Sequence, residues 1–167
     1  MQFDFYSTHS ILVARGSSVN LARKIQERGG KSVLIVTDPG VLAAGLLNRA
    51  LAQFKELQLS VQIFSDVEAD PPIPVIKQAV LAAQECQADY IVGFGGGSSM
   101  DVAKLVALLS SGKERLEDIY GIGMAKGPRL PLILVPTTAG TGSEVTQSSV
   151  VTVSESEKKG VLSPHLL

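Results

Sequence analysis

The chain has few of the residues from which several kinds of functional site are built. Its 167 residues include one cysteine, two histidines and no tryptophan. The single cysteine, Cys86, cannot form an internal disulfide, and a lone cysteine among small helical residues is expected to serve only in packing. The two histidines, His9 and His165, are far apart in the sequence, and neither has a spacing typical of metal ligands. The sequence therefore predicts neither a disulfide-stabilised fold nor a histidine metal site.

Two further absences concern partners and location. The formal net charge is −1 and no cluster of basic residues is present, so the chain lacks the charge pattern of a nucleic-acid-binding protein. The longest apolar runs have about six residues, whereas a membrane-spanning helix needs about 20. The N-terminus also lacks a basic segment followed by an apolar one, as a signal peptide would have. We therefore expect a cytoplasmic protein that binds neither nucleic acid nor membranes.

Short apolar runs alternate with amphipathic segments along the whole chain. Strands are expected at residues 32–37, 60–64, 90–94, 130–135 and 148–153, and helices from about 17 to 28, 39 to 57, 73 to 86 and 98 to 109. Met1–Phe5 and Ile11–Ala14 are predicted to form an N-terminal β-ribbon. Residues 154–160 are predicted to be a charged turn before a short closing strand at 161–162. The fold class is therefore α/β, with a mostly parallel, Rossmann-like sheet flanked by helices in one domain spanning 1–167.

The most informative segment is IVGFGGGSSMDVAK, from Ile91 to Lys104. An apolar strand leads into a run of glycines, and a helical pattern begins at Ser98. Such a turn lets a phosphate approach the backbone at the positive end of a helix dipole, which favours binding of a nucleotide pyrophosphate. The spacing lacks the third glycine of the usual dinucleotide fingerprint. The alternative is a structural turn in which Ser98 and Asp101 form a capping box.

A second segment rich in hydroxyl groups, Pro136–Thr146, directly follows the apolar run LPLILV. Threonine, serine and glycine offer short donors and exposed backbone N–H groups that could line a phosphate, a ribose or a nicotinamide amide. Such loops are also common as plain turns or helix caps. Both this loop and the glycine turn follow a buried strand, and ligands of open α/β sheets bind at the carboxyl ends of the strands. We therefore expect the two loops to meet at one site.

Together, GGGSSMDVAK (residues 95–104) and PTTAGTGSEVT (residues 136–146) resemble the iron-containing, group III alcohol dehydrogenase family. The motifs lie about forty residues apart, and the similarity extends along the whole chain. The resemblance implies an NAD(P)-dependent oxidoreductase whose N-terminal α/β domain binds the dinucleotide. It also implies a helical C-terminal domain whose aspartate and histidines hold a divalent metal, commonly iron or zinc. No counterparts of these ligands are found in this sequence, so we expect the metal-binding domain to be absent from this chain.

The resemblance also implies which residues contact the cofactor. Asp38 follows a predicted strand, where a carboxylate can accept both ribose hydroxyls and repel a 2′-phosphate, so NAD is expected rather than NADP. An N-cap role is the alternative for Asp38. Lys104 is expected at the helix surface or in a structural contact. Lys158 matches the family's cofactor-contacting lysine, although Lys159 leaves that assignment uncertain by one residue. The full set of expected contacts is Asp38, Asp70, Gly96, Gly97, Ser98, Asp101, Thr137, Thr138, Thr141, Thr146, Val150 and Lys158.

Asp70 departs from the family pattern, because many members have an asparagine at this position. The function implied is hydride transfer between an alcohol, or a related hydroxyl compound, and NAD(P). We expect this chain alone to bind the dinucleotide without turnover, and to form a homodimer. A small alcohol or aldehyde would bind only together with the helical domain. The alternatives are a non-catalytic nucleotide-binding module, half of a split enzyme, or a relative of maleylacetate reductase, glycerol dehydrogenase or dehydroquinate synthase.

Overall fold

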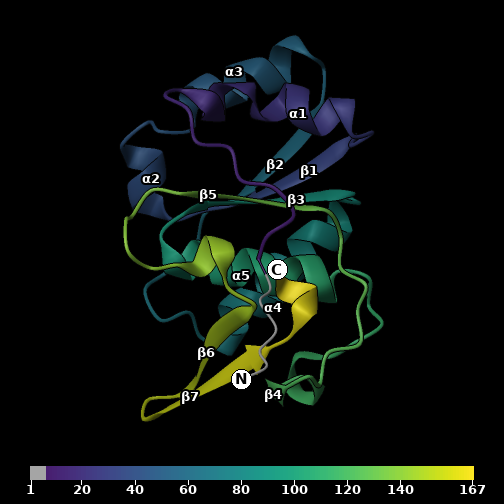
Figure 1. Cartoon of the computed structure of the whole chain (residues 1–167), viewed down its shortest axis with the longest axis vertical. Helices are drawn as coiled ribbons and strands as arrows, with labels where there is room; N and C mark the ends of the chain where they lie inside the picture. Colours follow the sequence, from purple (N-terminus) through teal and green to yellow (C-terminus); the bar gives the residue numbers. More distant parts are fainter. Residues whose placement is uncertain (1–6) are drawn as a thin grey trace, which may run out of the picture.

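Four parallel strands form the centre of the structure (Figure 1). In this computed structural model, which describes residues 7–167, the strands are β1 (Ser32–Val36), β2 (Ser60–Phe64), β3 (Tyr90–Gly95) and β5 (Leu132–Pro136), arranged in the order β2-β1-β3-β5. All three pairings in this sheet are parallel, which requires a crossover connection between each pair of strands. The α/β fold with a parallel, helix-flanked sheet is therefore confirmed.

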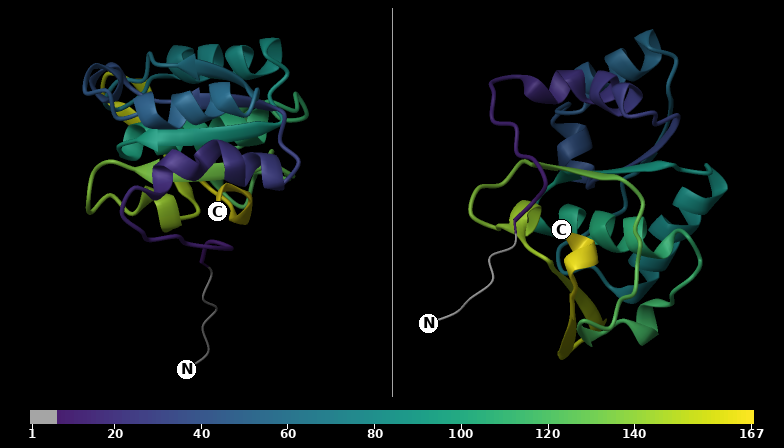
Figure 2. Two further views of the ribbon diagram at one scale, coloured as in Figure 1. Left: turned by 90° about the horizontal axis from the view of Figure 1, so that it is seen from above. Right: turned by 45° about the vertical axis from the view of Figure 1, so that its right-hand side comes forward.

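Helices cover both faces of this sheet. α1 (Leu21–Glu27) and α3 (Asn48–Glu56) pack on one face, and α4 (Ile73–Glu85) and α5 (Gly97–Leu109) pack on the other (Figures 1 and 2). The short helix α2 (Pro39–Ala43) begins directly after β1, at the carboxyl edge of the sheet. The strands supply apolar side chains to both cores, which explains why β1 and β3 are almost continuously apolar.

A second, smaller sheet packs against α5 on the side away from the main sheet (Figure 1). It contains β4 (Gly121–Ile122), β6 (Ser148–Ser154) and β7 (Glu157–Leu162) in the order β4-β7-β6, and β6 and β7 form an antiparallel hairpin. Short 3-10 turns complete the chain at Ser17–Asn20, Leu116–Asp118, Ser143–Val145 and Pro164–Leu166. The sequence did not predict that the last strands form a separate sheet.

Helix α5 is buried on all sides between the two sheets. Every residue from Ser99 to Leu109 except Asp101 is buried, including the side chain of Lys104. A helix that is apolar all round belongs in the interior of a protein, because it has no face that water would solvate well. The glycine turn that begins α5 is therefore fixed by the most buried helix of the described chain.

The single helix expected from residue 39 to 57 is wrong, because two helices, α2 and α3, occupy this segment. Gly45 separates them with φ 67°, a left-handed conformation that glycine adopts without the steric cost of a side chain. After this break the chain changes direction, so that Leu47 is buried in the core while Leu46 is half exposed.

Two further predictions fail at the ends of the chain. The expected turn at residues 154–160 is too long, because β7 begins at Glu157 and only two residues separate it from β6. Its charged residues can be in a strand because this end of the hairpin lies at the surface, where Glu157 and Lys158 are exposed and Lys159 is partly exposed. Ile11–Ala14 forms no strand, and Met1–Phe5, its expected partner in the β-ribbon, lies outside the described residues. Within residues 7–167, no helix is long and apolar enough to cross a membrane.

Gly93 of β3 should be essential for the close packing of α5 on the main sheet. A Cβ at this position would lie 2.8 Å from Cβ of Ala103 and 2.8 Å from Cδ2 of Leu134. We expect Gly93→Ala to reduce the free energy of unfolding by about 2 kcal/mol, because extra volume in a close-packed core forces the backbone apart. Urea denaturation measures this change. Gly96→Ala is the matched control, since its Cβ would meet only the Thr138 hydroxyl at 3.4 Å, and equal loss in both variants would contradict the prediction.

Candidate functional site

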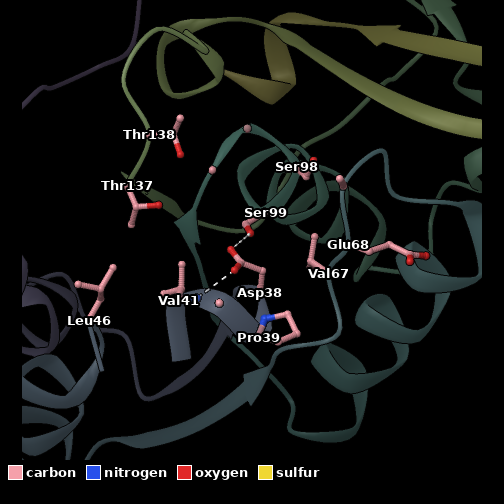
Figure 3. Close-up of a pocket in the computed structure, with 14 residues that line it drawn as sticks. Asp38, Pro39, Val41, Leu46, Val67, Glu68, Ser98, Ser99, Thr137 and Thr138 are labelled. Carbon is pink, nitrogen blue, oxygen red and sulfur yellow. Dashed lines mark hydrogen bonds between the residues drawn. The ribbon is translucent and has the colours of Figure 1, made fainter. Parts of the chain in front are cut away.

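A cavity of about 550 Å³ opens at the carboxyl ends of the main-sheet strands (Figure 3). Its wall is formed by the segments that follow β1, β2, β3 and β5. Six of the expected site residues line it: Asp38, Gly96, Gly97, Ser98, Thr137 and Thr138. The glycine turn and the hydroxyl-rich loop therefore meet, as the sequence predicted, at the edge where α/β sheets commonly bind ligands.

Asp38 lies at the centre of the cavity wall, and both of its carboxylate oxygens accept hydrogen bonds (Figure 3). The Val41 backbone N–H donates to Oδ1 at 3.0 Å, and the Ser99 hydroxyl donates to Oδ2 at 3.2 Å. The bond from Val41 makes Asp38 the N-cap of α2, so the capping role is confirmed. Capping uses one lone pair of one oxygen, so the carboxylate retains capacity to accept further hydrogen bonds from the cavity.

The glycine turn presents backbone rather than side chains to the cavity. Gly96 is the N-cap of α5, and no side chain caps this helix. The alternative of a Ser98–Asp101 capping box is therefore wrong, because Asp101 accepts a hydrogen bond from the Val150 N–H instead. The N–H groups of the first helical turn are consequently free of side-chain partners, which is the arrangement that attracts an anion to a helix N-terminus.

The hydroxyl-rich loop is attached to the glycine turn by a backbone hydrogen bond, from the Thr137 N–H to the Gly95 carbonyl at 2.9 Å. Side chains at the two glycines would close the space between the loops. A Cβ on Gly96 would lie 3.4 Å from the Thr138 hydroxyl oxygen, and one on Gly97 would lie 3.4 Å from Cβ of Thr141. Thr141 is thus beside the glycine turn although it does not line the cavity.

Lys104 connects α5 to the end of the hydroxyl-rich loop. Its side chain is fully buried, and its ammonium donates to the carbonyls of Thr146 at 2.8 Å and Ser148 at 2.9 Å. Burial lowers the pKa of Lys104, and the negative charges of Asp101 and Glu144 oppose this decrease. The expectation of a structural contact is correct, whereas a position on the helix surface is wrong. The surface position is wrong because α5 is buried on all sides, so no face of this helix is exposed to water.

Asp101 lies beside Lys104 on the side of α5 that faces the small sheet. Its Oδ2 accepts the Val150 N–H at 3.0 Å, and its Oδ1 is 3.8 Å from Nζ of Lys104. Burial raises the pKa of Asp101, while the bond from Val150 and the charge of Lys104 oppose this increase. Asp101, Thr146 and Val150 therefore form one group at the small sheet, and none of them lines the cavity. The Val150 side chain is exposed.

Asp70 and Lys158 also lie outside the cavity wall, and they contact each other. Oδ1 of Asp70 is 2.6 Å from Nζ of Lys158, in an ion pair whose two side chains are about half exposed or more. Next to this pair, the Thr152 N–H donates to the Pro71 carbonyl at 3.1 Å, joining the β2–α4 segment to β6. Lys159 is directed elsewhere, with its ammonium 5.5 Å from the centre of the Tyr120 ring.

The sequence did not identify eight further residues of the cavity wall: Pro39, Gly40, Val41, Leu46, Val67, Glu68, Ala69 and Ser99. Three of them follow β2, whose carboxyl end lies at the same edge of the sheet as those of β1 and β3. The segment after β2 contains no glycine motif that would mark it as part of a site. Only the place of β2 in the parallel sheet could have indicated that this segment reaches the cavity. No group of three or more His, Cys, Asp or Glu side chains in residues 7–167 could hold a metal ion.

A parallel sheet with a cavity at its carboxyl edge, lined by a glycine turn and a capping aspartate, defines a nucleotide-binding type of α/β protein. Comparison with known proteins identifies the family. Iron-containing alcohol dehydrogenases match residues 8–167, so the chain belongs to this family.

Similar proteins include alcohol dehydrogenase 4 of Schizosaccharomyces pombe, 34% identical over 148 residues, which cover 89% of this chain and 35% of the relative. The 4-hydroxybutyrate dehydrogenase of Cupriavidus necator is 36% identical over 171 residues, covering 100% of this chain and 44% of the relative.

Solved structures show the same fold. The alcohol dehydrogenase from Oenococcus oeni superposes with a TM-score of 0.91 at 31% identity, covering 99% of this chain and 44% of that one. Sulfoacetaldehyde reductase from Bifidobacterium kashiwanohense, solved in complex with NAD+, superposes with a TM-score of 0.89 at 27% identity. The match covers 100% of this chain and 44% of that one. The chain thus spans less than half the length of these relatives.

Replacing Lys104 should destabilise the protein strongly. In Lys104→Met the carbonyls of Thr146 and Ser148 lose their donor and Asp101 loses its neighbouring cation, so we expect the free energy of unfolding to fall by about 3 kcal/mol. Lys77→Met is the control, because Lys77 forms an exposed ion pair with Glu117, and its loss should change stability by less than about 1 kcal/mol. Chemical denaturation of both variants measures the difference. Similar stabilities would show that the buried ammonium does not hold α5 to the loop.

Proposed function

We propose that this chain is the dinucleotide-binding part of an NAD-dependent alcohol dehydrogenase. The observation that supports this most directly is the cavity, where Asp38, the Gly96–Ser99 turn and the Thr137–Thr138 hydroxyls lie together. In this proposal Asp38 accepts hydrogen bonds from the adenosine ribose. Gly96, Gly97 and Ser98 hold the pyrophosphate.

The chemistry of these residues fits a dinucleotide. The first turn of α5 offers N–H donors without side-chain partners, which suits a pyrophosphate. The absence of Cβ atoms at Gly96 and Gly97 leaves room for phosphate between this turn and the hydroxyl-rich loop. In the same cavity, Asp38 offers acceptors to ribose hydroxyls, and its charge would repel the additional phosphate of NADP.

The remaining expected residues would contact the other end of the cofactor. Thr141 lies beside Gly97, and Thr146, Asp101 and Val150 continue from the hydroxyl-rich loop along α5 and β6. Asp70 and Lys158 form the ion pair at the junction of the β2–α4 segment and β7. We propose that these six residues line the path from the pyrophosphate towards the nicotinamide ring, which accepts a hydride from an alcohol when the cofactor is bound.

The relatives support this reaction class. They include an NAD-dependent methanol dehydrogenase of Bacillus methanolicus and a lactaldehyde reductase of Escherichia coli. We propose that the complete enzyme acts on a small alcohol or aldehyde, as a cytoplasmic homodimer, with a divalent metal such as iron or zinc. Within the described residues 7–167, no group of three or more His, Cys, Asp or Glu side chains could hold this metal.

Calorimetric titration with NAD, and separately with NADP, tests the proposed cofactor. We expect the chain to bind NAD more tightly than NADP. Asp38→Ala should weaken NAD binding about tenfold or more and abolish the preference, because the carboxylate would no longer accept from the ribose or repel a 2′-phosphate. Ser98→Ala should weaken binding of both cofactors by a similar factor, because both contain the pyrophosphate.

Asp118→Ala is the matched control, since Asp118 is an exposed carboxylate outside the cavity wall. It should leave both affinities unchanged. Binding of neither cofactor by a chain that circular dichroism shows to be folded would refute the proposal for this chain.

A further inference from the structure

The Ser99 side chain lines the cavity and points at Asp38 (Figure 3). Its hydroxyl donates to Oδ2 of Asp38 at 3.2 Å, across sixty-one positions of sequence. On the other carboxylate oxygen, the Val41 N–H donates to Oδ1 at 3.0 Å. Each oxygen of Asp38 is therefore held by one donor, and the two donors come from different helices, α5 and α2.

Ser99 is itself fixed by its surroundings. Its residue is 1% exposed, so the hydroxyl has no bulk water with which to exchange its hydrogen bond. Gly95 lies beside the Ser99–Asp38 hydrogen bond, and the space there would not accommodate a side chain at Gly95 as well. A Cβ on Gly95 would lie 2.5 Å from Oγ of Ser99 and 3.0 Å from Oδ2 of Asp38. The absence of a side chain at Gly95 is thus a requirement of the Ser99–Asp38 contact.

We infer that Ser99 is a positioning residue that fixes the Asp38 carboxylate for the ribose, and so contributes to the choice between NAD and NADP. This inference rests on the function proposed above, in which Asp38 accepts from the ribose. A carboxylate oxygen can accept more than one hydrogen bond, so the bond from Ser99 leaves capacity for a ribose hydroxyl.

The physical advantage of this contact is preorganisation. A carboxylate that rotates freely must lose side-chain freedom when the ribose binds, and that loss reduces affinity. With both oxygens held before binding, less freedom remains to be lost, and the negative charge stays where a 2′-phosphate would approach. Because Ser99 belongs to the same helical turn as Ser98, the contact also fixes the distance between the ribose and pyrophosphate positions.

Ser99→Ala tests the inference by titration with both cofactors. We expect NAD binding to weaken by about three- to tenfold, the cost of immobilising one side chain that is no longer held before binding, while NADP binding changes little. The ratio of the two dissociation constants should therefore move towards one. A purely structural role for Ser99 would weaken both cofactors equally and leave this ratio unchanged.

Ser32→Ala is the matched control. Ser32 also donates its hydroxyl to a protein acceptor, the Cys86 carbonyl at 2.7 Å, but it lies at the opposite end of β1 from Asp38. The ratio of the NAD and NADP dissociation constants of Ser32→Ala should equal that of the unchanged protein. Ser99→Cys provides a second variant if Ser99→Ala folds poorly. A thiol is somewhat larger than a hydroxyl and donates weakly, so the ratio for Ser99→Cys should fall between those of the unchanged protein and Ser99→Ala.

The double variant Asp38→Ala/Ser99→Ala separates this inference from the proposed function. If Ser99 acts through Asp38, its removal should change neither affinity once Asp38 is alanine. If the unchanged protein prefers NAD and Asp38→Ala abolishes the preference, the proposed function holds. An unchanged or increased NAD preference in Ser99→Ala would then overturn the inference alone. Absence of NAD preference in the unchanged protein would overturn the assignment of Asp38 itself.

Discussion

The arrangement of the molecule depends most on one buried cation, the ammonium of Lys104. It binds two backbone carbonyls at the start of β6, while the helix that carries it packs on the main sheet. Moving an ammonium from water into an apolar interior is unfavourable unless its hydrogen bonds are replaced, so the loop must return to this place on α5. This constraint places the small sheet, and with it the end of the hydroxyl-rich loop, against the helix that begins with the glycine turn.

The sequence predicted the main sheet well. The strands β1 and β3 are almost entirely buried and therefore appear in the sequence as continuous apolar runs, whereas β2 alternates between more exposed and more buried residues, which is also a strand pattern. Ser60–Phe64 was predicted with its correct bounds, and β3 was predicted to within one residue. The break at Gly45 was missed, because a glycine in an otherwise helical pattern costs too little to reveal a change of direction. The separate sheet of β4, β6 and β7 depends on contacts with α5 that no local pattern records.

The residues of the candidate site also divide into those with a local sequence signature and those that distant contacts bring to the site. The motifs identified the two loops, because glycine and hydroxyl residues after buried strands leave a local signature. Residues such as Leu46 and Val67 line the cavity only because the chain returns there after a turn or a neighbouring strand, so their own sequence gives no indication. For a related reason the sequence left two alternatives for Lys104, a position at the helix surface and a structural contact, because the carbonyls that bind it are more than forty residues away.

The burial of α5 on all sides has a consequence for how the chain unfolds. A helix with no polar face cannot remain helical in water once one of its two covering layers separates, because its apolar side chains would be exposed. The main sheet and the small sheet therefore both pack on α5, and neither sheet alone would bury this helix well enough to keep it folded. Partial opening of this chain should be rare, and its two sheets should be gained and lost together in a single cooperative transition.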